Sequence, residues 1–254
     1  MGPERKSLMP PRGPARVPAD AMKVLGSRAR PDTSWVAQVA GCSVSRAESA
    51  VDGLRRFSQD VEGLAERIAK TGRSYYAQFP APIDLYALAR LAKPANIVES
   101  GVSSGVSTAF LLLAVRSNGG GALHSIDFPV ERRRGSRNES WSIPQGLESG
   151  WAIPPKLRLG WDLRLGRSED LLGPLLAEVG GLDFFCHDSP VDASHFEFEM
   201  DAIRGHLEPG SIVVADNTEW KTFEATAESL GATAIRRKKS SLGAFRVPGP
   251  SVHN

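Results

Sequence analysis

The sequence predicts an α/β fold: a doubly wound, mostly parallel sheet with helices on both faces. Three observations predict it. From residue 96 onward, short apolar runs typical of strands alternate with longer segments of helical periodicity. A glycine-containing turn follows the first of these runs, and acidic residues follow several later ones. The 254 residues, 41% of them hydrophobic, are enough for one such domain and a small appended element.

The composition narrows the classes of function. A formal net charge of +2 does not require a nucleic-acid or membrane-surface partner. No apolar run is long enough for a membrane span. The two cysteines, Cys42 and Cys186, lie far apart and have no metal-ligand spacing, which fits a reducing cytoplasm. We therefore expect a cytoplasmic protein.

Residues 1–30 are rich in proline and carry seven basic residues against two acidic ones. This composition is typical of a disordered basic arm. A nucleic-acid-binding arm is the alternative, but no aromatic side chain is interleaved to stack on bases.

Residues 31–93 form a helical N-terminal element in this interpretation. Apolar residues recur at helical spacing from Asp32 to about Gly72, which predicts two helices, the second capped by Ser43 or Ser45. A further amphipathic helix is expected over 83–92, before Pro94. We expect these helices to cover one side of the sheet and to offer a surface for homo-oligomerisation.

Residues 94–254 form the main domain. Strands are predicted over 97–100, 122–126, 157–165, 182–186 and 211–215, and helices over 107–115, 168–179 and around 196–206. An insertion at about 129–160 interrupts this alternation, and Trp141, Trp151 and the following Trp161 accompany it. A segment of this length is often a lid over a substrate, but its tryptophans can equally pack it onto the body.

The first clue to a ligand is the turn from Gly101 to Gly105, between a strand and a helix. It is not the GxGxxG of dinucleotide binding, because Ser103 replaces the middle glycine. Asp127 follows the second strand, where a carboxylate can accept both hydroxyls of a ribose. Ser168 lies where the 157–165 strand gives way to a helix, so it can cap that helix or contact an adenine ring. Singly, each residue also has an ordinary structural explanation.

A second clue is a set of oxygen ligands at two strand ends. Asp188 follows the 182–186 strand, and Asp216 with Asn217 follows the 211–215 strand. Two carboxylates and an amide oxygen suit Mg²⁺. Acidic residues at strand ends are also common without a metal, so this alternative stays open.

Together these motifs resemble the class I S-adenosylmethionine-dependent methyltransferases. The chain is most similar to the metal-dependent catechol O-methyltransferases and the macrocin-type sugar O-methyltransferases, over roughly residues 75–247. The resemblance rests on the glycine turn in 98–107, on the strand-end acids and on the 213–217 segment. It implies a seven-stranded Rossmann-like fold and methylation of an oxygen on a catechol-like molecule or a sugar diol.

The resemblance also implies roles for individual residues. The cofactor, S-adenosylmethionine, would be bound by Glu99, Gly101, Ser103, Gly105, Ser107, Asp127, Ser168 and Glu169. A Mg²⁺ ion or another divalent metal would be held by Asp188, Asp216 and Asn217.

The sequence departs from the catechol-type enzymes at their lysine base, because Val191 occupies that position. We expect His195, Asp188 or the metal to promote loss of the acceptor's proton. Four alternatives stay open: a metal-independent methyltransferase, an NAD-dependent oxidoreductase, a non-catalytic nucleoside-binding module, and an RNA methyltransferase that uses the basic residues 236–239. The oxidoreductase is disfavoured by the missing glycine, and the RNA enzyme by the near-zero net charge.

Overall fold

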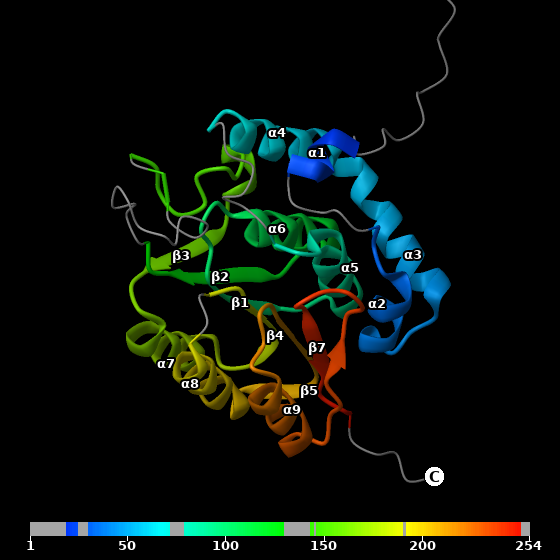
Figure 1. Cartoon of the computed structure of the whole chain (residues 1–254), viewed down its shortest axis with the longest axis vertical. Coiled ribbons are helices and arrows are strands. Elements are labelled where there is room, and N and C mark those ends of the chain that lie inside the picture. The colour runs from blue at the N-terminus through cyan, green and yellow to red at the C-terminus, as the bar shows by residue number, and fades with distance from the viewer. Residues whose placement is uncertain are drawn as a thin grey trace, which may run out of the picture.

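The computed structural model describes residues 19–24, 30–71, 79–129, 143–144, 146–189 and 192–249. Its centre is a seven-stranded sheet in the order β3-β2-β1-β4-β5-β7-β6 (Figure 1). The strands are β1 Asn96–Ser100, β2 Ala122–Asp127, β3 Trp161–Leu165, β4 Leu182–His187, β5 Leu207–Ala215, β6 Ile235–Arg236 and β7 Gly243–Arg246. The first five are parallel, and β7 runs antiparallel to both β5 and β6. This confirms the predicted fold class.

Helices cover both faces of the sheet (Figure 1). One face carries α2 Thr33–Ala40, α3 Val44–Asp52, α5 Pro82–Ala92 and α6 Val106–Asn118, with α4 Ser58–Ala69 outside them. The other carries α7 Ser168–Val179, α8 Ala193–Arg204 and α9 Trp220–Ser229. Adjacent residues of β1 show the two layers, because Ile97 packs into the first core and Val98 into the second.

Between residues 32 and 71 the N-terminal element contains more helices than the two predicted there. Asp32 caps α2 by accepting a hydrogen bond from the Trp35 backbone, and Gly41, at φ +64°, ends that helix. Ser43, one of the two predicted caps, then begins α3 by accepting from the backbone of Arg46. A 3₁₀ turn at Gly53–Phe57 separates α3 from α4, which the helical periodicity alone did not reveal.

Part of the predicted disordered arm is folded. Ala19–Val24 forms the short helix α1, which packs against α4 and buries Ala21. Residues 1–18 and 25–29 lie outside the described residues. Among the described helices, none is long and apolar enough to cross a membrane.

The described part of the insertion is packed onto the body. Ala152 and Ile153 are fully buried, Trp151 is buried as well, and a short 3₁₀ helix forms at Pro155–Leu157. Residues 130–142 and 145, and Trp141 among them, lie outside the described part of the chain. The prediction of a lid over the acceptor therefore remains a prediction.

Candidate active site

The site lies where the chain leaves the sheet in opposite directions, between β1 and β4. Ligands bind at such switch points in open α/β sheets, outside the carboxyl ends of the strands. Here the Asp188 backbone N–H donates to the Ser100 carbonyl at 2.7 Å. A Cβ on Gly101, which has φ +89°, would lie only 2.3 Å from the Asp188 carbonyl oxygen. Only glycine fits this approach.

The glycine turn continues into the start of α6. Ser103 adopts φ +49°, and Gly105, at φ +91°, is the residue before the helix. A Cβ on Gly105 would lie 2.5 Å from Ile153 of the insertion. Glycine at position 105 therefore allows the insertion to pack onto the turn. The motif alone could not predict this requirement for glycine.

Glu99 and Ser107 bring unsatisfied polar atoms into the buried region next to the turn. Glu99 Oε2 accepts hydrogen bonds from Thr108 Oγ1 and Ser125 Oγ, both at 2.7 Å. Among the described residues, Glu99 Oε1 and Ser107 Oγ are buried without a hydrogen-bond partner of standard geometry, although Ser107 lies close enough to Glu99 and Asp188 to lower the pKa of both. Burial raises the pKa of Glu99 to about 7. Buried polar atoms without partners are costly, so these two fit a region that a polar ligand completes.

Asp127 is the last residue of β2, and each of its carboxylate oxygens accepts a hydrogen bond. Oδ1 accepts from the backbone N–H of Val102 at 3.2 Å, and Oδ2 accepts from Ser149 Oγ. Burial raises the pKa of this carboxyl. Ser149 was missed in the sequence, because a serine inside an insertion carries no periodic or motif signal.

The structure brings Asp188 and Asp216 together at the ends of β4 and β5. The Asp216 backbone donates to the His187 carbonyl at 3.0 Å, continuing the pairing of the two strands. Burial and then the charge of Asp216 raise the pKa of Asp188 well above its ordinary value. Asp216 accepts hydrogen bonds from Ser241 and, at 3.2 Å, from Asn217 Nδ2. The three predicted metal ligands thus share one strand-end region.

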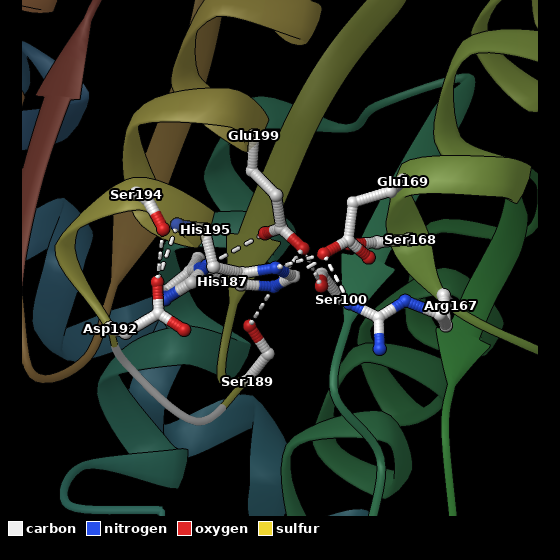
Figure 2. Close-up of polar contacts among 10 residues, drawn as sticks. All are labelled: Ser100, Arg167, Ser168, Glu169, His187, Ser189, Asp192, Ser194, His195 and Glu199. Atoms are coloured by element: carbon white, nitrogen blue, oxygen red, sulfur yellow. Dashed lines mark hydrogen bonds and ion pairs between the residues drawn. The ribbon is translucent and has the colours of Figure 1, made fainter.

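His195 belongs to a charged network centred on Glu199 of α8 (Figure 2). The buried Glu199 carboxylate contacts His187 Nδ1 at 2.8 Å and His195 Nε2 at 3.0 Å, and Ser100 donates to it. Although burial raises the pKa of Glu199, its hydrogen bonds to the two histidines hold it below its ordinary value. Glu199 and His187 are residues that sequence reasoning missed.

His195 also lies near the residues predicted to contact adenine. Its Nδ1 is 3.3 Å from Glu169 Oε1, and its Nε2 is 3.4 Å from Ser168 Oγ. The hydrogen bond to Glu199 is the largest cause that raises the pKa of His195, to about 9. A histidine with this pKa is mostly protonated at neutral pH, which counts against a role as base while His195 keeps its contact with Glu199. The catalytic role of His195 stays a prediction.

Residues 98–218 match the family model of a methyltransferase domain. The match spans β1 to the end of β5 and includes the glycine turn, Asp127, Asp188 and Asp216. The chain therefore contains a methyltransferase domain, and its seven-stranded sheet is the fold expected from the resemblance to the class I S-adenosylmethionine-dependent methyltransferases.

Solved structures agree with this methyltransferase fold. The O-methyltransferase TomG from Streptomyces achromogenes, solved with S-adenosylmethionine, is 19% identical with a TM-score of 0.51, covering 80% of this chain and 90% of that one. A methyltransferase from Geobacter sulfurreducens is 16% identical with a TM-score of 0.52, covering 81% and 96%. At these identities the likeness shows the fold alone. No curated protein sequence matches the chain.

Proposed function

We propose that this methyltransferase transfers the methyl group of S-adenosylmethionine to an oxygen of a small molecule. The observation that carries the proposal is the meeting of Asp188 and Asp216 beside the glycine turn. TomG, which shares the fold, is described as an O-methyltransferase, and this agrees with an oxygen acceptor.

The cofactor would extend along the carboxyl edge of the sheet. In this proposal Asp127 accepts hydrogen bonds from the ribose hydroxyls, and the unpartnered oxygens of Glu99 and Ser107 complete their bonds with the methionine part. The adenine would lie by Ser168 and Glu169 at the start of α7. Phe128, 58% exposed and next to Asp127, offers an apolar surface on that side.

We further propose that Asp188, Asp216 and Asn217 hold a divalent cation, Mg²⁺ by the chemistry of the donors. The two carboxylates are buried and close enough to repel each other when both are ionised. A cation between them would offset the free energy of this repulsion and of their desolvation. The described residues contain no group of three or more His, Cys, Asp or Glu side chains that could hold a metal, and in this proposal the amide oxygen of Asn217 would be the third protein ligand. When bound, the ion would favour the deprotonated form of the acceptor hydroxyl. Two adjacent hydroxyls, as in a catechol or a sugar diol, would chelate it.

A metal-independent reaction is the second candidate, and the position of Asp188 beside the glycine turn favours it. In that case the S–CH₃ bond breaks as the O–CH₃ bond forms, and the hydroxyl proton passes to the Asp188 carboxylate. This step requires Asp188 to be ionised before the transfer.

Transfer of a labelled methyl group to a panel of catechols and sugar diols, with Mg²⁺ or with excess chelator, tests the proposal. We expect Mg²⁺-stimulated turnover that falls at least about tenfold in Asp216→Ala, with nearly unchanged affinity for the demethylated cofactor, S-adenosylhomocysteine. Asp201→Ala, an exposed acid on α8, is the matched control. Full activity in chelator would select the metal-independent reaction. Transfer only to nitrogen or carbon acceptors from a wider panel would refute O-methylation.

A further inference from the structure

The insertion contributes a side chain to the predicted ribose site. Ser149 is 3% exposed, and its hydroxyl donates to Oδ2 of Asp127, a residue 22 positions earlier in the chain. Asp127 has its other oxygen on the backbone of Val102, in the glycine turn. The carboxylate is therefore fixed between the turn and the insertion.

The turn that carries Ser149 is itself hydrogen-bonded to the glycine turn between Gly101 and Gly105. The Gly150 N–H donates to the Ser103 carbonyl at 2.7 Å, and the Ala152 N–H donates to the Ser104 carbonyl at 3.1 Å. Arg158 donates to the Gly150 carbonyl at 2.8 Å, which braces the turn from within the insertion. A Cβ on Gly150 would lie 2.5 Å from the Trp161 ring, so this backbone fits tightly. The position of the Ser149 hydroxyl is thus determined by the fold.

The number of available lone pairs decides whether Ser149 competes with the ribose or supports it. An ionised carboxylate offers about four acceptor sites. Val102 and Ser149 make the two hydrogen bonds of standard geometry, one on each oxygen, and the backbone N–H groups of Ser103 and Phe128 make only weaker contacts that lower the pKa of Asp127. Two ribose hydroxyls can therefore replace these weaker contacts. Ser149 does not have to leave when a ribose binds. It removes rotational freedom from Asp127 before the ligand arrives, which lowers the cost of ordering on binding.

We propose that Ser149 is a positioning residue, which orients Asp127 toward the ribose hydroxyls of the cofactor. The inference rests on the proposed placement of the ribose at Asp127. It makes the insertion part of the cofactor site, in addition to any role over the acceptor.

Calorimetric binding of S-adenosylhomocysteine and of its 2′,3′-dideoxyribose analogue tests the inference. In Ser149→Ala we expect affinity for S-adenosylhomocysteine to fall about three- to tenfold, the range for one lost hydrogen bond. Affinity for the dideoxy analogue should stay the same, because it has no hydroxyls for Asp127 to accept. Glu148→Ala, an exposed neighbour on the same turn, is the control and should bind both ligands like the wild type. Ser149→Cys keeps the side-chain volume with a weaker donor, and serves if Ser149→Ala does not fold.

The outcomes separate this inference from the proposed function. If Ser149→Ala binds S-adenosylhomocysteine as tightly as the wild type does, the positioning role of Ser149 is overturned. The proposed function is not affected by that result. An equal loss of affinity for both ligands would also overturn the positioning role, because that result reports general damage to the loop. Failure of the wild type to prefer S-adenosylhomocysteine over the dideoxy analogue would refute the ribose placement itself.

Discussion

Glu199 shows how one buried residue can raise the pKa of a neighbouring histidine, His195. Its carboxylate is fully buried, yet it contacts two histidines and one serine hydroxyl. Through His195 it links α8 to Glu169 at the start of α7, as Figure 2 shows. A buried carboxylate with these partners stays ionised and holds His195 in the protonated state.

The first prediction concerns the pH dependence that this network gives to stability. The pKa of His195 is raised from 6.5 to about 9, so its protonated form stabilises the fold fully below about pH 6.5. That contribution is lost as the pH rises toward 9. We therefore expect the stability difference between wild type and His195→Asn to shrink across this interval. Thermal unfolding at several pH values measures it, at roughly 2–4 °C for each kcal/mol lost. Midpoint curves that run parallel from pH 6 to pH 9.5 would contradict the assignment.

At the residue scale, the sequence predicted the site residues that lie at the ends of strands. It did not predict the side chains that form hydrogen bonds or ion pairs with those residues. Asp127, Asp188 and Asp216 were recognisable because each follows an apolar run that forms a strand. Ser149 and Glu199 lie inside an insertion and a helix, and only tertiary packing brings them to the site. The charge of His195 could not be predicted either, because it depends on Glu199.

At the element scale, a buried ion pair joins the N-terminal helices to the end of the sheet. Arg237 follows β6, and its Nε donates to Asp84 of α5 at 2.7 Å. The same carboxylate accepts from the Asp32 backbone at 3.1 Å, just before α2. Arg237 is 5% exposed and Asp84 fully buried. Of the basic residues 236–239 that the RNA-methyltransferase alternative would use, Arg237 is therefore buried in this ion pair, whereas Arg236, Lys238 and Lys239 are exposed.

The second prediction follows from this ion pair. Arg237→Met would leave the Asp84 carboxylate buried without its cation, so we expect a loss of about 3–5 kcal/mol in the free energy of unfolding. Denaturant unfolding measures it. Lys238→Met, at an exposed neighbouring position, should change stability by no more than about 0.5 kcal/mol. The double variant Asp84→Asn/Arg237→Met should recover part of the loss. If Arg237→Met is as stable as the wild type, the ion pair does not stabilise the contact between these elements.

The elements themselves were predictable where they are long and buried. The parallel strands β1, β2, β4 and β5 were found from continuous apolar runs. The antiparallel part of the sheet, strands β6 and β7 of two and four residues, is too short for a sequence period to identify. The helix α9 was not anticipated, and the 3₁₀ turn that divides α3 from α4 has no signature of its own.

At the scale of the whole molecule, the candidate site residues that end or follow strands lie along one edge of the sheet. Because β1 to β5 are parallel, their carboxyl ends meet at the same edge. This edge carries the glycine turn after β1, Asp127 at the end of β2, Ser168 after β3, Asp188 after β4 and Asp216 after β5. A homo-oligomer formed through the N-terminal helices and a cytoplasmic location stay predictions. The central claim is that this edge binds the cofactor with its ribose on Asp127.

Titration calorimetry of S-adenosylhomocysteine into the wild type, Asp127→Ala and Asp201→Ala tests that claim most directly. We predict binding to the wild type and to Asp201→Ala with equal affinity. Asp127→Ala should bind more weakly by about 1–3 kcal/mol, the cost of losing hydrogen bonds to a charged acceptor. Wild-type affinity in a folded Asp127→Ala variant, or no binding to the wild type, would contradict the account.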